Sequence, residues 1–171
     1  MSKQTNWFVI KTKSRFEKKL NAIYEEFGIK TFLPLTKEIR QWSDRKKWVE
    51  EPAIRGYIFV HTSEDRLVDL LQPEGAVHIL RYNKVAATVS EEEIELIRKI
   101  VNNKYRFEVT NDIFEEGDRV LVVMGGFKGY EGVWVSNKAK QYIVVQLDKA
   151  NMGFKVDIPA AYVKKLEPSA Q

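Results

Sequence analysis

The sequence of 171 residues contains no cysteine and only two histidines, His61 and His78. Without cysteine the chain has no disulfides, no thiolate metal ligands and no thiol nucleophile. With two histidines, no Ser/His/Asp arrangement stands out, and neither does a spacing typical of a metal site or of paired catalytic carboxylates. We therefore expect a protein that is not an enzyme, with no catalytic residue, no metal and no cofactor.

Long apolar runs are also missing, since no stretch approaches the ~20 residues that a membrane-spanning helix needs. The first residues, MSKQTNWFVIK, include no small-residue cleavage site, which argues against a secretory signal. We expect a cytoplasmic protein with no membrane partner, and we take it to be a monomer.

The net charge of +4 is small but unevenly distributed. Residues 1–48 hold 12 lysines and arginines against five acidic residues, whereas residues 111–171 hold eight of each. A local excess of this size suits weak contact with a nucleic-acid backbone, because neutralised phosphates release counterions. A solvated basic face explains the same pattern equally well.

The stretch Gly117 to Trp134, GDRVLVVMGGFKGYEGVW, has the most informative spacing in the chain. It does not match a Walker phosphate-binding loop, because the Lys-Ser/Thr pair of that loop is missing. It does not match the dinucleotide-binding pattern either, because the glycines do not fall at i, i+2 and i+5. Glycines between two apolar, β-branched runs indicate a sharply curled hairpin. This hairpin predicts a small β-barrel.

The N-terminal half alternates between strand and helix patterns. Residues 7–10 read as a buried strand, and a helix with a Ser14–Glu17 capping box and an apolar stripe from Phe16 to Phe27 follows, ended by Gly28. The next expected elements are a strand at 29–35, a projecting polar hairpin at 36–51 and a strand at 56–60. Trp42 and Trp48 in the hairpin either fold back onto the sheet or take part in binding.

Beyond residue 60 the pattern predicts a short helix with Leu67, Leu70 and Leu71 inward, stopped at Pro73, then strands at 76–80 and 85–89. A second capping box, Ser90 with Glu93, predicts a helix with Ile94, Ile97 and Ile100 on its apolar face. This order is the split βαβ pattern of ferredoxin-like domains. Strands at 141–147 and 154–158, with closure at 162–166, complete the small barrel, so the predicted fold class is α+β.

The glycine-rich segment resembles the KOW motif of NusG-type transcription factors. The matching positions are Gly117, Asp118, Val120, Val122, Gly125, Phe127, Gly129 and Gly132. Gly126 stands where the family usually has proline. The N-terminal half is similar to the NusG N-terminal domain in the pair Trp7-Phe8 and in the run Pro52…Gly56-Tyr57-Ile58-Phe59-Val60, and the chain ends in the similar VDIPAAYVKKL.

The resemblance implies an N-terminal polymerase-binding domain at 1–103, a linker at 104–114 and an SH3-like KOW barrel at 115–171. It implies a non-catalytic elongation or antitermination factor that grips the clamp helices of RNA polymerase, with Trp7, Ile54 and Tyr57 at the apolar surface. Lys13 falls at a position that contacts upstream or non-template DNA. Charge alone extends this contact to the group Arg15, Arg45, Lys46 and Lys47.

The departures from the family pattern are Ile54 and Arg55, which replace Phe-Pro, and the extended basic hairpin. They point towards a specialised paralogue of the RfaH or UpxY kind. The family also implies a KOW partner such as a small-subunit ribosomal protein or a termination factor. The β-branched residues of the KOW segment predict that it stays a barrel. The alternative reading is a ribosome-associated or other RNA-binding KOW protein.

Overall fold

The computed structural model describes residues 3–103, 106–110, 117–136, 141–147, 150 and 152–167. The chain divides into two compact units, residues 1–95 and 96–171, so the boundary falls inside helix α2 (Glu91–Asn102). In the described part of the chain, no helix is long and apolar enough to cross a membrane.

An antiparallel sheet forms the centre of the N-terminal unit. Its strands follow the order β2-β5-β1-β6, and β9 also pairs with β1. The strands are β1 (Thr5–Thr12), β2 (Lys30–Phe32), β5 (Tyr57–Ser63), β6 (Ala76–Ile79) and β9 (Thr88–Val89). β1 therefore lies inside the sheet, which explains why its apolar run from Trp7 to Ile10 is buried on both faces.

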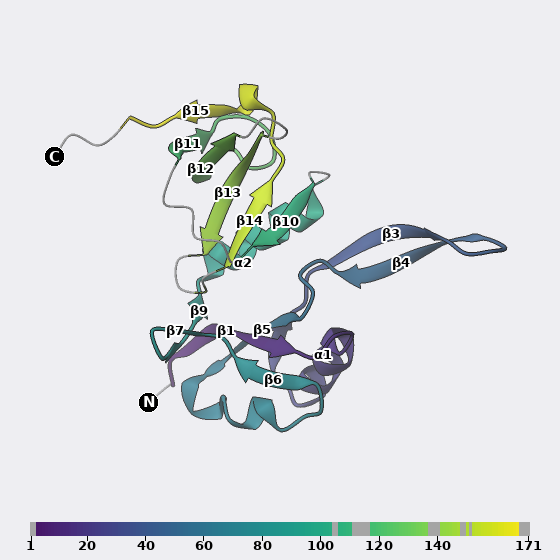
Figure 1. The fold of residues 1–171 in the computed structure, drawn as a ribbon. Helices are drawn as coiled ribbons and strands as arrows, with labels where there is room; N and C mark the ends of the chain where they lie inside the picture. The colour runs from purple at the N-terminus through teal and green to yellow at the C-terminus, as the bar shows by residue number, and fades with distance from the viewer. Residues whose placement is uncertain are drawn as a thin grey trace. The chain divides into compact units, whose positions relative to one another are not determined.

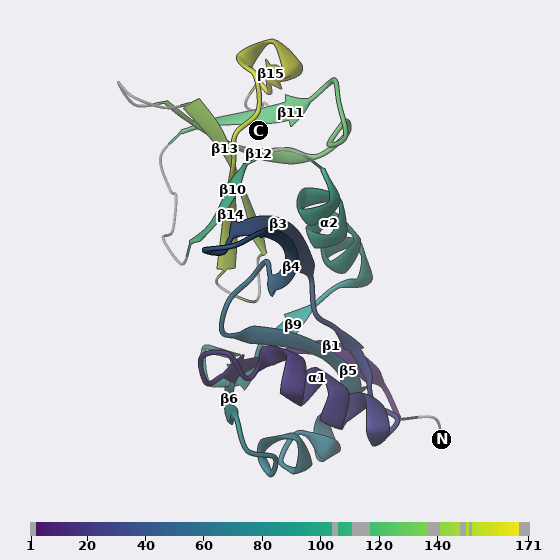
Figure 2. The same cartoon turned by 90° about the vertical axis from the view of Figure 1, so that its right-hand side faces the viewer.

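Helix α1 (Glu17–Glu26) lies along one face of this sheet (Figure 2). Side chains alternate along a strand, so this face takes Phe8 from β1 and its registered partner Val60 from β5 into one core with Leu20 and Tyr24 of the helix. The Tyr24 hydroxyl donates a hydrogen bond to the Leu70 carbonyl at 2.6 Å. Burial raises the pKa of Tyr24 to about 12.

The predicted capping box at the start of α1 is wrong. Phe16 is the N-cap residue, and no side chain caps the helix. The Glu17 carboxylate accepts a hydrogen bond from the Gly56 N–H at 2.7 Å instead, so a tertiary contact has replaced the local one. The far end of the predicted apolar stripe differs too, because Phe27 is 67% exposed.

Strands β3 (Leu35–Gln41) and β4 (Lys46–Pro52) form the predicted hairpin, which projects from the N-terminal unit (Figure 1). The two strands pair in a two-stranded sheet of their own. Trp42 and Trp48 are 50% and 65% exposed, so the interpretation that they fold back onto the sheet is wrong. The predicted strand at 29–35 ends at Phe32, and Pro34 separates it from β3.

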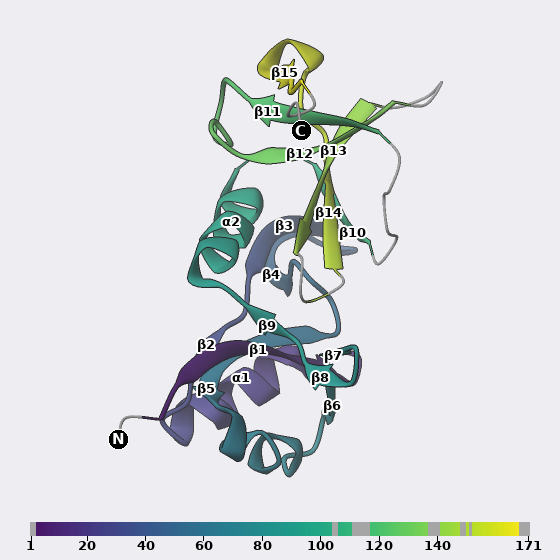
Figure 3. The ribbon, with the colours of Figure 1, turned by 90° about the vertical axis from the view of Figure 1, so that its left-hand side faces the viewer.

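The segment after β5 is less regular than expected. Two 3₁₀ turns, Glu64–Arg66 and Asp69–Leu71, replace the predicted helix, although Leu67 and Leu70 are buried as expected. The predicted strand at 85–89 is divided into β8 (Val85–Ala86) and β9. β8 pairs with β7 (Arg81–Tyr82) in a small hairpin (Figure 3).

The second capping box is confirmed. The Ser90 N–H donates to the Glu93 carboxylate at 2.7 Å, and the Glu93 N–H donates to the Ser90 hydroxyl at 3.1 Å. The predicted apolar face of α2 is buried as well, since Ile94, Ile97 and Ile100 are each 0% exposed.

The C-terminal unit is built on an antiparallel sheet in the order β10-β14-β13-β12-β11-β15. The strands are β10 (Phe107–Thr110), β11 (Asp118–Val122), β12 (Glu131–Ser136), β13 (Gln141–Leu147), β14 (Met152–Val156) and β15 (Val163–Lys165). β15 returns to pair with β11, and the 3₁₀ turn Ala160–Tyr162 precedes it. Strand β10 lies within the predicted connection 104–114, of which residues 104, 105 and 111–114 lie outside the described part.

The glycine-rich turn of this unit has the predicted hairpin form. Gly125 and Gly129, with φ of +81° and +92°, lie between β11 and β12. The Gly129 N–H donates to the Val122 carbonyl at 2.7 Å. Gly132 is required for another reason, because a Cβ atom there would lie 2.8 Å from the Val144 carbonyl oxygen of the neighbouring strand.

Candidate functional site

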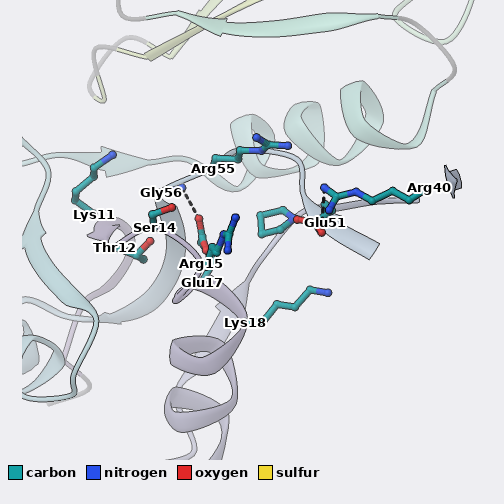
Figure 4. Close-up of a pocket in the computed structure, with 11 residues that line it drawn as sticks. Lys11, Thr12, Ser14, Arg15, Glu17, Lys18, Arg40, Glu51, Arg55 and Gly56 are labelled. Atoms are coloured by element: carbon teal, nitrogen blue, oxygen red, sulfur yellow. Dashed lines mark hydrogen bonds and ion pairs between the residues drawn. The ribbon is translucent and has the colours of Figure 1, made fainter. Parts of the chain in front are cut away.

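A basic pocket lies between the start of α1 and the base of the β3–β4 hairpin (Figure 4). Its volume is about 780 Å³. Five cationic side chains line it, namely Lys11, Arg15, Lys18, Arg40 and Arg55. The two carboxylates in the lining are Glu17 and Glu51. This composition suits an anionic ligand better than a neutral one.

The pocket wall is held by contacts between distant parts of the chain. Glu17 is 3% exposed, and its carboxylate accepts a hydrogen bond from the Gly56 N–H, which fixes the carboxylate in the pocket wall. The Lys18 ammonium donates to the Glu50 carbonyl and so joins α1 to β4. Glu51 pairs with Arg40 at 3.4 Å. Both acids of the lining therefore already have a partner within the protein.

Thr12 gives the pocket an unusual polar group. Its side chain is 3% exposed, and among the described residues nothing hydrogen-bonds to its hydroxyl. Burying a hydroxyl without a partner costs roughly 1–3 kcal/mol. Arg15, three positions further along the chain, has φ of +67°, a left-handed conformation that is uncommon for a non-glycine residue.

The three residues predicted for an apolar contact surface differ in how accessible they are. Trp7 is 3% exposed and Ile54 is 1% exposed, whereas Tyr57 is half-buried. The Trp7 indole N–H donates to the Glu91 carboxylate at 2.6 Å. The Lys11 ammonium lies 4.3 Å from the centre of the Tyr57 ring. Of the three side chains, Tyr57 is the one that a partner reaches without displacing protein atoms.

The residues predicted to contact nucleic acid are all exposed: Lys13, Arg15, Arg45, Lys46 and Lys47. They do not form one cluster. The last three lie at the tip of the hairpin and at the start of β4, while Lys13 and Arg15 lie between β1 and α1. Arg15 alone among them lines the basic pocket.

The candidate motif residues of the C-terminal unit are structural in this arrangement. Phe127 is 3% exposed, and Asp118 pairs with Lys165 at 2.6 Å across β11 and β15. At Gly117, with φ of +144°, a Cβ atom would lie 2.9 Å from the Trp134 carbonyl oxygen. Among the described residues no three His, Cys, Asp or Glu side chains gather in a group that could hold a metal ion.

A family model, described as transcription termination factor NusG, matches residues 5–98. This match covers the whole N-terminal sheet and more than half of the chain. The chain belongs to the NusG family. Within the family, Trp7, Ile54, Tyr57 and the basic pocket all fall inside the matched region.

Two solved structures are similar to this chain to different degrees, and the first of them supports the fold. A structure titled "Domain interaction in Thermotoga maritima NusG" aligns with a TM-score of 0.50 and 19% identity over 96% of this chain and 98% of that chain. Conformation B of the MjSpt4:Spt5 complex aligns with a TM-score of 0.32 and 20% identity over 96% of this chain and 99% of that one. No curated protein matches the sequence. The Thermotoga maritima alignment agrees with the predicted α+β fold of the NusG-family chain.

Sequence reasoning missed the basic pocket of this NusG-family protein. Lys11, Lys18 and Arg40 come from three separate elements, and nothing in their spacing indicates that they meet. The available signal was Arg55, which departs from the Phe-Pro pattern of the family. Arg55 precedes Gly56, whose N–H donates to the Glu17 carboxylate, and all three residues line the basic pocket.

Proposed function

We propose that this NusG-family protein is a non-enzymatic transcription elongation factor that binds the clamp helices of RNA polymerase in the cytoplasm. It suppresses pausing or termination, and the departures at Ile54 and Arg55 favour an operon-specific antiterminator. The observation that carries the proposal is the family match across residues 5–98, which includes the surface around Tyr57. The polymerase-binding module is assigned to residues 1–103.

The proposed polymerase contact centres on Tyr57. A half-buried aromatic ring that still faces solvent suits an apolar groove for helices, because such anchors supply much of the binding energy of an interface. Trp7 and Ile54 are almost fully buried. Their role is to support the shape of the surface around Tyr57 rather than to contact the polymerase directly. Lys11, held over the Tyr57 ring, adds positive charge at its edge.

The second part of the proposal concerns nucleic acid. Lys13, Arg15, Arg45, Lys46 and Lys47 are exposed cations and are proposed to contact upstream or non-template DNA. Each contact is weak by itself, because exposed charges at physiological salt are strongly screened. Their role is to hold DNA beside a polymerase to which the protein is already bound.

The C-terminal unit is proposed to act as a KOW module, residues 115–171, that recruits a small-subunit ribosomal protein or a termination factor. Its motif residues Gly117, Asp118, Gly125, Phe127, Gly129 and Gly132 support the hairpin geometry described above. In this proposal the motif residues maintain the shape of the module, and side chains outside the motif contact its partner.

Substitution of Tyr57 tests the proposal. Tyr57→Ala in the full chain should weaken binding to core polymerase and to isolated clamp helices by about ten-fold or more, because a hot-spot aromatic costs roughly 2 kcal/mol when truncated. Tyr82→Ala is the matched control, since Tyr82 is a 47% exposed tyrosine on β7. Equal affinities for the two variants would contradict the assigned surface. Copurification with ribosomes but not with polymerase would instead favour the RNA-binding alternative.

A further inference from the structure

A second pocket lies between α1 and the two 3₁₀ turns that follow β5. Its volume is about 550 Å³. Tyr24, Ile29 and Leu70 line it and are almost fully buried, so they form its floor. The hydrogen bond from the Tyr24 hydroxyl to the Leu70 carbonyl joins the helix to the turns beneath the opening. The pocket is therefore preformed and apolar at its base.

Apolar side chains also surround the opening of this pocket. Ile23 and Phe27, the C-cap residue of α1, both line it and lie four residues apart, which places them on one side of the helix. Val68 lies in the turn segment between the lining residues Arg66 and Asp69. In the described part of the chain, Phe27 and Val68 are the most exposed large apolar residues, at 67% and 68%. Apolar surface that extends beyond a pocket is typical of a protein contact.

Two exposed side chains of opposite charge, Arg66 and Asp69, complete the turn side of the pocket. Within the described residues neither side chain has an ion-pair partner. Leu67 and Val68 between them keep right-handed helical dihedrals, so a rise of roughly 2 Å per residue separates the two charges by roughly 6 Å along the segment. Residues four apart on a helix have about this spacing. A complementary partner brings a carboxylate to Arg66 and a cation to Asp69.

The backbone of the lining selects the secondary structure of the partner. The N–H groups of Phe27, Ile29 and Gln72 already donate to carbonyls of their own segments, and Pro73 has no N–H. The lining therefore provides no strand edge with which an extended peptide can pair. Such a peptide would leave its own backbone groups unpaired against apolar side chains, which is costly. A helix satisfies its backbone groups internally and avoids this cost.

This pocket and the Tyr57 surface lie on opposite faces of the N-terminal sheet. Tyr24 and Leu70 belong to the core that also contains Ile58. Tyr57 precedes Ile58 on β5, so its side chain points to the other face. Figure 2 shows α1 along one face of the sheet only. A partner in the pocket thus leaves the proposed polymerase contact free.

From these observations we propose that the pocket, together with Phe27 and Val68, is a docking groove for an amphipathic helix of a second protein. We call it the Phe27 groove. The helix places apolar side chains at i, i+4 and i+7 in the groove, with an acidic residue beside Arg66 and a lysine or arginine beside Asp69. The inference goes beyond the proposed function and does not depend on Tyr57.

An NMR titration of the isotope-labelled full chain tests the groove. The probe is a designed alanine-rich peptide of about 18 residues, long enough to form a helix, with leucines at i, i+4 and i+7 and a Glu and a Lys four residues apart beside them. It should shift the amide resonances of Phe27, Val68 and Asp69 and leave that of Tyr57 in place. A second peptide with proline at its centre should bind at least about ten-fold more weakly, because proline breaks the helix.

Two aromatic variants test the apolar part of the groove. Phe27→Ala should weaken binding of the helical peptide about ten-fold, because a truncated aromatic anchor loses much of its contact. The melting temperature should stay nearly unchanged, since Phe27 is exposed. Trp48→Ala is the matched control, because Trp48 is a 65% exposed aromatic residue on β4. It should change the affinity less than about two-fold.

Charge reversal tests the position of the acidic residue of the partner. Arg66→Glu should weaken binding several-fold, and a peptide in which Lys replaces the Glu should recover most of the loss on this variant. Arg81→Glu, which reverses an exposed cation on β7 outside the groove, should leave the affinity unchanged.

Three results would overturn the inference. If millimolar helical peptide causes no shift around Phe27, the groove does not bind a helix. If the proline peptide binds equally well, the occupant is not helical. If the free chain dimerises and Phe27→Ala abolishes the dimer, the groove is a contact between two copies. Polymerase affinity, measured in parallel, should be the same for Phe27→Ala and the unmodified chain, so failure of the proposed function is detected separately.

Discussion

The N-terminal unit contains two antiparallel ribbons, β1–β5 and β3–β4, that each align seven residue pairs. The first lies inside a sheet, and Val9, Ile10, Phe59 and Val60 are all 0% exposed. The second stands apart, with Ile39, Trp42 and Trp48 at least half exposed. Strand pairing therefore does not by itself assign a role to an aromatic residue. Surroundings decide whether it stabilises the fold or remains available to a partner.

Amide hydrogen exchange should show the largest difference between the ribbons. Because β1–β5 amides are buried in the core, they should exchange only through global unfolding. The hairpin amides should exchange through local opening, at rates higher by several orders of magnitude, because an isolated two-stranded ribbon is only marginally stable. Similar protection in both ribbons would mean that the hairpin opens only with the whole unit.

Tryptophan truncation should separate the ribbons almost as clearly. Trp7→Ala should lower the free energy of unfolding by about 3–5 kcal/mol, because Trp7 is 3% exposed and its removal leaves a cavity. Trp48→Ala should change it by less than about 0.5 kcal/mol. Urea denaturation measures both. Comparable losses would show that the hairpin contributes to the core stability.

The pH dependence of stability tests the core beneath β1–β5. Below about pH 10, Tyr24 keeps its proton whether the chain is folded or unfolded. Between pH 10 and about 12 the unfolded chain loses that proton and the folded chain retains it, so stability should fall with rising pH. The expected loss is roughly 2 kcal/mol. Tyr24→Phe should lack this component, and an unchanged alkaline profile in that variant would contradict it.

The two capping-box sequences offer the smallest test of the same lesson. Ser90→Ala should cost about 1 kcal/mol, because the Ser90 hydroxyl accepts the Glu93 N–H. Ser14→Ala should cost close to nothing at the helix start, because no side chain caps α1. Thermal unfolding of the two variants side by side gives the comparison. A larger loss for Ser14 would mean that its hydroxyl supports the fold in another way.

The sequence predicted the features that depend on local pattern. The fold class, the projecting hairpin, the second capping box and the curled glycine hairpin all follow from spacing and residue type. Three features escaped because distant residues decide them. The Glu17 carboxylate accepts the Gly56 N–H instead of capping α1, and Leu67 and Leu70 are buried by two 3₁₀ turns rather than a helix. The predicted strand at 85–89 is divided because β8 pairs with β7 while β9 pairs with the distant β1.

Prediction of the candidate site was limited in the same way. Residue type and resemblance indicated Tyr57 and the basic tip of the hairpin, but the burial of Trp7 and Ile54 depends on packing that sequence spacing does not contain. The pocket could not be predicted because its cations come from β1, the segment between β1 and α1, α1 itself, β3 and the segment before β5.

The uneven exposure of the tryptophans has a spectroscopic consequence. Light emitted by a solvated indole is shifted to longer wavelength than light from an enclosed one, so Trp42 and Trp48 supply the red edge of the emission, and Trp7 supplies the blue edge. The unlabelled protein therefore has an intrinsic fluorescent reporter of the hairpin, and selective quenching of the red edge detects binding close to Trp42 or Trp48.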